Sequence, residues 1–494
     1  MPILTELVIN NLLKGISLIT NNYQLLPIIT KLVINTSKHS DFMKIPERPP
    51  KIGDNEIDDL VKYLTNESFI QLIKEANIKY YYWSDFKYKF NSGQISSELL
   101  WKIVRVKRAL SAERIIINGV YKFKYNLTIN TQQKLHEFDL NLGGRLGGEE
   151  IIPNSDKNRY LISSIMEEAI ASSQLEGAAT TRKEAKKMLR EERKPKNESE
   201  QMILNNYNTI RKLKDLIDKK LTIDIILEIH SSITKNTLNS PGQEGQFRKS
   251  NDIVVVNSNG DIVHIPPDFE QLETLMKDYC DFANELNNER FIHPIIRATI
   301  LHFLLGYIHP FTNGNGRTAR AIFYWYLLKE GYWLIEYMSI SRMIKRSPGQ
   351  YAKAYLYSEF DDNDLTYFIN YHMKTMELAF DSLKSYINRK IIEKQEIYNF
   401  KIIKNINDRQ SLILKSLFDE PKLTFTIKEV QNRFNTAYDT ARTDIMGLEK
   451  YGLIKKNISG KKKLVYYRAE NFDGILSKLI AEGQKTIIQQ QAFH

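Results

Sequence analysis

Cysteine is nearly absent from this sequence: its 494 residues include one, Cys280. An intramolecular disulfide is therefore excluded, and a reducing, cytoplasmic setting is expected. No run of about 18 uncharged apolar residues exists, so we expect no membrane-spanning helix and no membrane partner. Cysteine pairs and an HExxH sequence are also missing, which argues against zinc ligation by His293, His302 and His309. The phosphate-binding loops GxxxxGK[ST] and GxGxxG are absent as well, which excludes two common nucleotide-binding folds.

The composition is that of an ordinary soluble globular protein, with 42% hydrophobic and 26% charged residues. The length suffices for about two to four domains, each with its own core. The net charge of +11 is compatible with contacts to nucleic acid or phosphate-bearing ligands. The net charge alone does not show that the protein binds nucleic acid or phosphate, since lysines exposed to solvent without such a function give the same net charge.

The distribution of proline, glycine and apolar residues along the chain predicts five parts. An aromatic-rich segment, "KYYYWSDFKYKF" (Lys79–Phe90), is expected to be exposed within an otherwise helical N-terminal region. A glycine-rich stretch, Asn141–Asp156, separates that region from a long helical part in which apolar residues recur at spacings of three and four. The five predicted parts are an N-terminal extension (1–45), an N-terminal helical region (46–156), a main helical domain with a helical connector (157–400), a small domain (405–475) and a C-terminal tail (476–494).

One segment interrupts the helical periodicity of the main domain. In "NDIVVVNSNGDIVHIPP" (Asn251–Pro267), β-branched residues lie on both sides of Asn259-Gly260, a dipeptide typical of tight hairpin turns. The sequence therefore predicts a single β-hairpin, Ile253 to Ile265, on a helical domain.

The segment "IHPFTNGNGRTARAIFYWYLL" (Ile308–Leu328) concentrates polar and conformationally permissive residues directly before an apolar helix. Gly314 and Gly316 allow a ligand to approach the backbone closely. Because the helix begins here, its unpaired N–H groups and its dipole favour a bound anion. The segment therefore predicts a phosphate site.

Three charged or titratable side chains of this segment fit a phosphate-transfer site. Arg317 and Arg320 are three residues apart, so they share one helix face and are expected to reach the same polyphosphate. His309 lies just upstream and has the chemistry of a proton acceptor, with a pKa expected near the working pH.

The stretch "HPFTNGNGRTAR" (His309–Arg320) resembles the signature of Fic proteins, HPFx[D/E]GNGRxxR. The flanking "HPIIRATILHFLLGYIHPF" and "GQFRKSNDIVVV" are similar to the family's surroundings of that motif, and the resemblance covers roughly residues 160–380. It implies a mainly α chain with a helical Fic fold and one β-hairpin flap. It also implies a protein adenylyltransferase that moves AMP from ATP onto a Ser, Thr or Tyr hydroxyl of a target protein, with Mg²⁺.

The resemblance assigns roles position by position. His309 would be the general base, Arg317 would hold the β-phosphate and Arg320 the γ-phosphate, while Phe311 would anchor the loop. An anion hole around the phosphates would be formed by Gly314, Asn315 and Gly316. The hairpin would be the flap that docks the target by adding a strand, through Ile253, Val254, Val255, Val256, Ile262 and Val263.

Asn313 departs from the family pattern, which has Asp or Glu there to hold the Mg²⁺. An amide oxygen can ligate Mg²⁺ but lacks the negative charge that a hard cation prefers. Asn313 is therefore our metal candidate, and its identity bears on metal affinity and on which group is transferred.

An upstream segment, "ISSIMEEAIASSQLEGAATTR" (Ile162–Arg182), predicts a helix over 162–177 that ends at Gly177. Ser172 and Glu176 lie four residues apart and share one face. The Ser-x-x-x-Glu-Gly pattern resembles the inhibitory-helix motif of Fic proteins that carry it N-terminal to the catalytic core. This implies that Glu176 pairs with Arg320 and so blocks productive ATP binding.

The small C-terminal domain resembles a winged helix-turn-helix, with helices at 409–418, 426–434 and 437–454 and a hairpin over 455–469. On the third helix we expect Ala441, Ile445 and Leu448 to face the core and Tyr438, Arg442, Thr443 and Met446 to face out. DNA binding, with lysines at the hairpin tip on phosphates, and protein docking or dimerisation are weighed equally, because Asp439 and Asp444 weaken the helix's positive potential.

Taken together, these patterns predict a cytoplasmic protein adenylyltransferase that is inhibited by Glu176 and carries a C-terminal winged helix. Two alternatives stay open: a nucleotide-sensing DNA-binding regulator with little catalysis, and a Fic enzyme that transfers UMP, phosphocholine or phosphate. The identity of the target protein, and whether the chain forms a homodimer, are not predicted.

Overall fold

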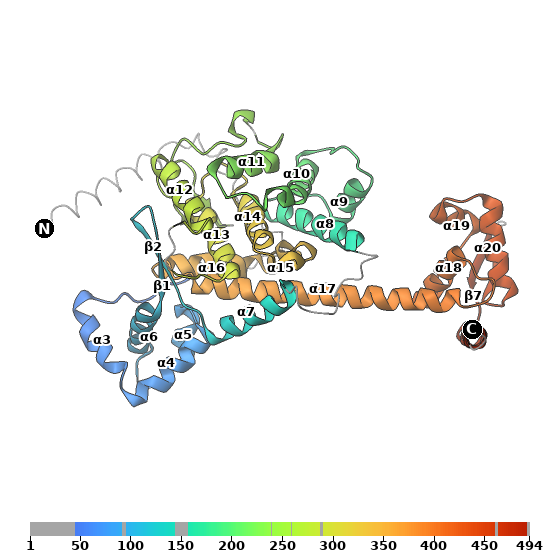
Figure 1. The fold of residues 1–494 in the computed structure, drawn as a ribbon, viewed down its shortest axis with the longest axis horizontal. Coiled ribbons are helices and arrows are strands. Elements are labelled where there is room, and N and C mark those ends of the chain that lie inside the picture. The colour runs from blue at the N-terminus through green and yellow to red at the C-terminus, as the bar shows by residue number, and fades with distance from the viewer. Residues whose placement is uncertain are drawn as a thin grey trace. The chain divides into compact units, whose positions relative to one another are not determined.

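The computed structural model describes residues 45–90, 95–143, 157–238, 240–257, 259–286, 290–459 and 463–491. The predicted N-terminal extension (1–45), except its last residue, and most of the glycine-rich stretch 141–156 lie outside these ranges. The chain divides into two compact units, Met1–Leu383 and Lys384–His494. Both are mainly helical (Figure 1), as predicted. Within the described ranges, none of the helices combines the length and the apolar character needed to cross a membrane.

Among the described residues, the first unit contains fifteen α-helices, four strands and several short 3₁₀ helices. The last of these α-helices, α17, begins in this unit and extends past its end at Leu383. Its α-helices are α3 (Ile57–Tyr63), α4 (Glu67–Lys79), α5 (Trp83–Lys89), α6 (Ser97–Ser111), α7 (Ile129–Leu142), α8 (Lys157–Leu175), α9 (Arg182–Arg190), α10 (Glu198–Lys212), α11 (Ile223–Thr234), α12 (Leu272–Ala283), α13 (Pro294–Ile308), α14 (Asn315–Lys329), α15 (Ile340–Arg346), α16 (Pro348–Phe360) and α17 (Thr366–Lys401). Its strands are β1 (Glu113–Ile117), β2 (Tyr121–Tyr125), β3 (Val255–Val256) and β4 (Ile262–His264).

The N-terminal helices α3 to α6 form their own aromatic core, and this corrects one prediction. The aromatic-rich segment Lys79–Phe90 was expected to be exposed, but most of its rings are buried. Phe86 is fully buried and packs edge-on against Trp101 of α6, with ring centroids 4.9 Å apart. The apolar area that these rings remove from water explains why the segment folds inward.

A second hairpin, β1–β2, was not predicted. The two strands pair antiparallel from Glu113↔Tyr125 to Ile117↔Tyr121, and Asn118 and Gly119 between them both have positive φ. Alternate residues of each strand are buried, so the hairpin lies on the helical core with one face.

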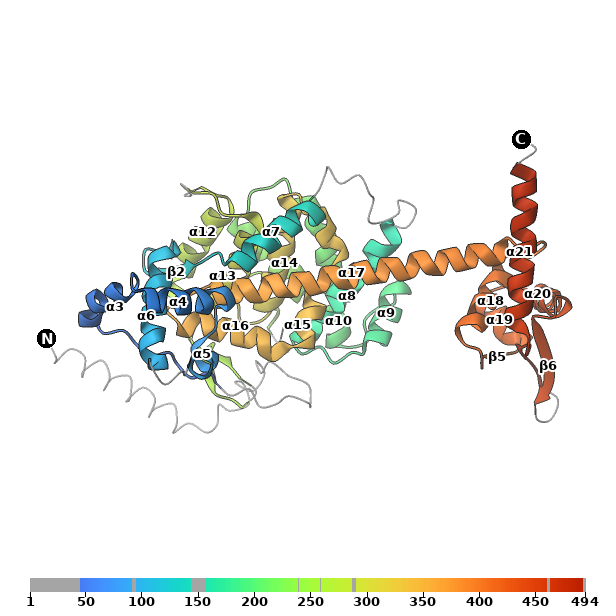
Figure 2. The same ribbon diagram turned by 90° about the horizontal axis from the view of Figure 1, so that it is seen from below.

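Helices α13 and α14 lie side by side in the middle of the first unit (Figures 1 and 2). Both are buried on nearly every face, which agrees with their apolar sequences. The segment that joins them, residues 309–314, is the predicted phosphate loop. The fold thus holds this loop between two immobile helix ends.

Helix α8, predicted as the inhibitory helix, packs against α10 and α15. It ends in a Schellman motif: Gly177 has φ of 97°, and the N–H of Ala178 donates to the carbonyl of Ser173 at 3.0 Å. Glu168 fastens the middle of the helix, because its buried carboxylate accepts hydrogen bonds from Tyr324 Oη, Ser339 Oγ and both N–H and Oγ–H of Ser341. Its apolar residues Ile165, Met166 and Ile170 are buried, whereas Ile162 is exposed.

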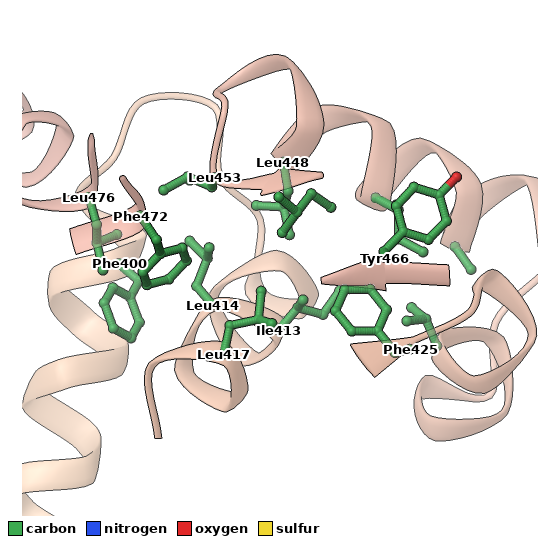
Figure 3. Close-up of a cluster of buried hydrophobic side chains, with 14 of the residues drawn as sticks. Phe400, Ile413, Leu414, Leu417, Phe425, Leu448, Leu453, Tyr466, Phe472 and Leu476 are labelled. Atoms are coloured by element: carbon green, nitrogen blue, oxygen red, sulfur yellow. The ribbon is translucent and has the colours of Figure 1, made fainter. Parts of the chain in front are cut away.

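The second unit has one hydrophobic core of its own (Figure 3). The predicted three helices and hairpin are present, together with a third strand and a last helix: α18 (Asp408–Asp419), β5 (Thr424–Phe425), α19 (Ile427–Phe434), α20 (Tyr438–Lys450), β6 (Ile454–Ser459), β7 (Lys463–Arg468) and α21 (Phe472–Gln491). The strands form one antiparallel sheet in the order β5-β7-β6.

Two predictions for this unit are corrected. Residues 476–494 were expected to form a tail, but α21 extends to Gln491, and Phe472 and Leu476 belong to the core. The core also includes Phe400 and Ile403, which precede the predicted boundary at 405. These apolar side chains join the unit because it would otherwise leave its core open on one side.

Helix α20 presents the predicted faces. Ala441, Ile445 and Leu448 are fully buried, whereas Tyr438, Arg442, Thr443 and Met446 are exposed. Asp444 was expected to weaken the positive potential of this helix, but it does not lie on the exposed face. It is buried and accepts hydrogen bonds from Arg409 Nε at 2.6 Å and Asn407 Nδ2 at 2.6 Å. Its charge is therefore neutralised inside the unit.

Candidate active site

His309 lies at the junction of α13 and the phosphate loop, where it caps the helix with a left-handed backbone (φ 49°). This conformation turns the chain sharply, so that Phe311 enters the core and is fully buried. Phe311 stacks on the imidazole of His230 from α11, with ring centroids 3.7 Å apart and planes 5° apart. Phe311 was predicted to anchor the loop, and the residue on which it packs is His230, which the sequence analysis did not indicate.

The tautomer of His309 suits a proton acceptor. Its Nδ1 donates to the carbonyl of Gly306 at 3.2 Å, which leaves the lone pair on Nε2. Among the residues that the structure describes, none hydrogen-bonds to this Nε2. Burial lowers the pKa of His309 to about 4, and the charge of His264 acts in the same direction. We predicted a pKa near the working pH, so in this state the imidazole is a weaker base than expected but is always unprotonated at neutral pH.

The loop is closed by Asn315, whose side chain is 3% exposed. Its Oδ1 accepts from the N–H of Phe311 at 2.9 Å, and its Nδ2 donates to the carbonyl of the same residue at 2.8 Å. Both polar atoms are therefore used within the protein. Asn315 can therefore contribute its backbone N–H to the predicted anion hole, but not its side chain.

Gly314 and Gly316 each occupy a place that a side chain would obstruct. Gly314 is the N-cap of α14, with φ of 82°, and a Cβ there would lie 2.8 Å from Thr234 Cγ2. A Cβ on Gly316 would lie 2.2 Å from Oε1 of Glu176. The carboxylate of Glu176 therefore lies over the first turn of α14, where unpaired N–H groups favour an anion.

Arg320 is 3% exposed, and its guanidinium is held by residues of α8 and by Glu176 directly after it. Its Nε donates to Ser172 Oγ at 2.8 Å, and its Nη2 donates to Ser172 O at 3.0 Å and to Glu176 Oε1 at 2.9 Å. Burial acts to lower the pKa of Arg320, but the interactions with Glu176, Tyr351 and Glu168 together outweigh it and the pKa is raised. The predicted contact of Glu176 with Arg320 is present, and Ser172, for which no contact was predicted, accepts hydrogen bonds from the same guanidinium.

Arg317 lies on the same helix face and is 1% exposed. Its Nη1 donates to the carbonyl of Ile233 at 3.1 Å, while its Nε has no partner among the described residues. Burial lowers the pKa of Arg317 to about 10, so it remains charged at neutral pH. A buried cation with an unused donor is suited to a further anionic partner.

The residues around Asn313 do not form a Mg²⁺ site by themselves. Oδ1 of Asn313 accepts from the N–H of Gly314 at 2.6 Å, so its one neutral ligand atom already has a partner. The carboxylate closest to the loop, that of Glu176, is bound to Arg320. Across the described ranges, no group of three His, Cys, Asp or Glu side chains is arranged to hold a metal ion. We therefore assign no chemical step to the metal.

The predicted hairpin is present, with short strands β3 and β4 that pair through Val255↔His264 and Val256↔Ile262. At its turn, Oδ1 of Asn257 accepts from the N–H groups of Asn259 and Asp261, and Gly260 has φ of 86°. Ile262 is 56% exposed, whereas Val256 is buried. The other predicted flap residues, Ile253, Val254, Val255 and Val263, are half-buried.

Three residues that position this site were missed by the sequence analysis. His230 accepts from the N–H of Gly245 at Nδ1 and donates from Nε2 to the carbonyl of Asn313. Arg248 donates from Nε to the carbonyl of His309 at 3.0 Å, and from its own N–H to the carbonyl of Pro310. His264 of β4 contacts the end of α13. Their contacts are all distant in sequence, so no local pattern indicates them.

This arrangement coincides with a known family. Residues 220–327 match the model of the "Fic/DOC family". This stretch of the chain is therefore similar to the Fic/DOC family, and α13, the loop and most of α14 form the C-terminal part of the match.

The chain is also similar to curated proteins and to solved structures. "Protein adenylyltransferase Fic" of Nematostella vectensis is 37% identical over 114 residues, which are 23% of this chain and 24% of that protein. The protein of the same name from Drosophila willistoni is 32% identical over 127 residues, 26% of this chain and 22% of that protein. The chain thus spans about a quarter of the length of these relatives. Among solved structures, Fic-1 from C. elegans is 18% identical with a TM-score of 0.43 and covers 68% of this chain and 86% of that chain. A Fic family protein from Desulfovibrio desulfuricans is 16% identical with a TM-score of 0.42 and covers 69% and 95%, respectively.

Proposed function

We propose that this protein is an adenylyltransferase that transfers AMP from ATP to a hydroxyl group of a target protein, or of itself. The observation that carries the proposal is that His309 Nε2 has no partner among the described residues and lies in the same loop as a helix N-terminus against which a carboxylate, that of Glu176, already lies. One group accepts a proton, and the other binds anions. A hydroxyl attack on a phosphate needs both at the same place.

The proposed reaction is a single displacement at the α-phosphorus of ATP. The target oxygen forms a bond to phosphorus as the bond to the oxygen that bridges the α- and β-phosphates breaks. Pyrophosphate leaves, and the hydroxyl proton passes to Nε2 of His309. The first-turn N–H groups of α14 and the guanidinium of Arg317 stabilise the charge on the phosphates.

Glu176 is proposed as a built-in inhibitor of this reaction. Its carboxylate lies against Gly316 and accepts a hydrogen bond from Arg320. A triphosphate would bring negative charge to the same place, so the two exclude one another. Binding of the γ-phosphate by Arg320 then requires Glu176 to move away.

Mg²⁺ and the location of the protein are further parts of the proposal. ATP would carry the ion on its own phosphates, with Asn313 adding one neutral oxygen, because Mg²⁺ commonly binds through few protein ligands and several waters. A cytoplasmic location is supported by the single cysteine, Cys280, which is buried and reduced.

The second unit is proposed to be a winged-helix module that binds a partner. Its helix order and antiparallel sheet support this, and so does the exposed face of α20 with Tyr438, Arg442 and Met446. Because Asp444 is neutralised by Arg409 within the unit, one of the two charges that argued against DNA is removed. This favours DNA as the partner over another protein.

Intact mass spectrometry of the Glu176→Gly protein after incubation with ATP and Mg²⁺ tests the main proposal. A gain equal to one AMP supports it. A gain equal to one phosphate would assign a different transfer, and parallel incubations with UTP and CDP-choline test transfer of UMP and phosphocholine. No gain with any of the three nucleotides, alone or with a cell extract as the source of targets, would support the nucleotide-sensing regulator.

A further inference from the structure

His264, on strand β4 of the flap, is buried between two other elements. Its Nε2 lies 2.7 Å from the carbonyl oxygen of Tyr307, near the end of α13, and its Nδ1 lies 2.8 Å from Oε2 of Glu359 on α16. Its ring also packs against the ring of Tyr307, with centroids 5.0 Å apart. One side chain of the flap therefore contacts both α13, which ends at the catalytic loop, and α16.

Both partners of His264 are hydrogen-bond acceptors, since a carbonyl and a carboxylate carry no hydrogen to donate. Each ring nitrogen of His264 therefore lies within hydrogen-bond distance of an oxygen, one on α13 and one on α16. The carbonyl of Tyr307 is one of the last in α13, where carbonyl groups lack a partner within the helix. The side chain thus joins β4 to both helices.

The flap depends on such anchors because it is a small two-stranded hairpin. Two strands of two and three residues are marginal alone. At its base, Arg248 donates to Ser250 O and Pro267 O and, on the other side, to His309 O. His264 provides a second attachment on the returning strand, two residues in sequence from the exposed Ile262.

We propose that His264 is a positioning residue that latches the flap onto the end of α13 and so sets the distance between a docked target hydroxyl and His309. The catalytic consequence of this contact rests on the proposed function, whereas the attachment of the flap to α13 does not depend on it. Tyr307 precedes His309 by two residues, so the same contact fixes the flap relative to the base.

Two substitutions in the full-length Glu176→Gly protein test the latch. His264→Gln retains one donor, and Glu359→Gln retains an acceptor but removes the charge. Amide hydrogen exchange, followed by mass spectrometry, should speed up by about tenfold in residues 253–265 of either variant, since a hydrogen bond to a charged group contributes about that much. Exchange in α13 and α14 should not change. His136→Gln on the exposed face of α7 is the matched control and should alter neither measurement.

The catalytic readout separates positioning from general damage. Autolabelling at saturating ATP should fall by about tenfold in both variants, while the dissociation constant for ATP stays within about twofold. The labelling rate of the double variant should be no lower than that of the less active single variant, because both substitutions act on the same contact between His264 and Glu359.

The outcomes distinguish the two proposals. Unchanged flap exchange in both variants would overturn the latch, whatever the labelling does. Faster flap exchange with unchanged labelling would overturn its catalytic role. If the parent Glu176→Gly protein transfers nothing, the proposed function fails, and the exchange measurement still decides whether His264 holds the flap.

Discussion

A Cβ on Gly316 would lie 2.2 Å from Oε1 of Glu176, so the inhibitory carboxylate occupies the space directly above the first turn of α14. Glycine is needed at this position for an inhibited protein as much as for a nucleotide. The same carboxylate accepts a hydrogen bond from Arg320 at 2.9 Å. Inhibition and phosphate binding are thus two uses of one small volume.

Removal of this carboxylate should activate the protein. Glu176→Gly is expected to raise labelling with ATP by about ten- to a hundredfold, since hydrogen bonds between charged groups contribute roughly 1.5–3 kcal/mol. Arg320→Ala in that background should reverse much of the gain. Glu273→Gly, an exposed helical change in α12, is the control for loss of helix stability. Equal labelling by the parent and Glu176→Gly would contradict the inhibitory role.

Replacement of the proposed base should separate chemistry from binding. His309→Ala, in the Glu176→Gly background, is expected to lower the labelling rate by about 10²–10⁴-fold. ATP affinity by calorimetry should change little, because the anion-binding groups lie on α14. Labelling at the parental rate under saturating ATP would exclude His309 as the base.

A carboxylate at position 313 should strengthen metal binding. Asn313→Asp keeps an oxygen that can accept from Gly314 N–H and adds one negative charge, so the Mg²⁺ concentration for half-maximal labelling should fall. The maximal rate should change less, because tighter ground-state binding does not by itself favour the transition state. Superimposable Mg²⁺ titrations of the two proteins would show that this side chain does not contact the ion.

Acid should destabilise the first unit through its buried histidines. Burial lowers the pKa of His372 to about 3 and those of His230 and His309 to about 4. Because these folded-state values lie below the value of about 6.5 in an unfolded chain, the unfolded state binds more protons between them. The free energy of unfolding should fall as pH drops from about 6.5 to 4, by on the order of 1–2 kcal/mol for each histidine at pH 5.

Urea unfolding at pH 7.5, 6 and 5 measures this dependence. His372→Phe should reduce it by about a quarter, because burial also lowers the pKa of a fourth histidine, His302, and neither ring nitrogen of His372 has a partner among the described residues. His136→Phe, at an exposed position, is the control. A pH dependence that His372→Phe leaves intact would mean that other groups titrate in this range.

The second unit should bind duplex DNA through its hairpin tip. Lys461 and Lys462 lie outside the described residues, and Lys463 begins β7. Replacement of these three lysines by glutamate should abolish binding and flatten its salt dependence, because each phosphate contact releases counterions. Lys478→Glu on α21 is the matched control. No electrophoretic shift of any duplex at low salt would favour a protein partner.

The central motif could be located from sequence because its chemistry is local. Gly314, Gly316, Arg317 and Arg320 lie within seven residues, and a helix start defines their mutual geometry. The contact between α8 and Arg320 was expected from a family resemblance, since no local rule joins residues 144 positions apart.

The missed features depend on long-range packing. Trp101 buries the aromatic segment that we expected to be exposed, and His230, Arg248 and His264 make their key contacts with backbone groups far along the chain. The hairpin β1–β2 is different, because Asn118-Gly119 after a run of isoleucines was a readable signal. Our prediction of the pKa of His309 was wrong because the burial that lowers this pKa cannot be judged from neighbours in sequence.

The four hydrogen bonds that Glu168 accepts make helix α8 a fixed part of the first unit. Separating the carboxylate of Glu176 from Arg320 then calls for rotation of one side chain directly before Gly177. It does not require the helix to detach, and the hydrogen bonds from Arg320 to Ser172 can remain. Rotamer exchange takes nanoseconds, whereas local unfolding takes microseconds to seconds. The inhibitor therefore equilibrates faster than any catalytic cycle, and activity should follow a change in ATP concentration without a lag phase.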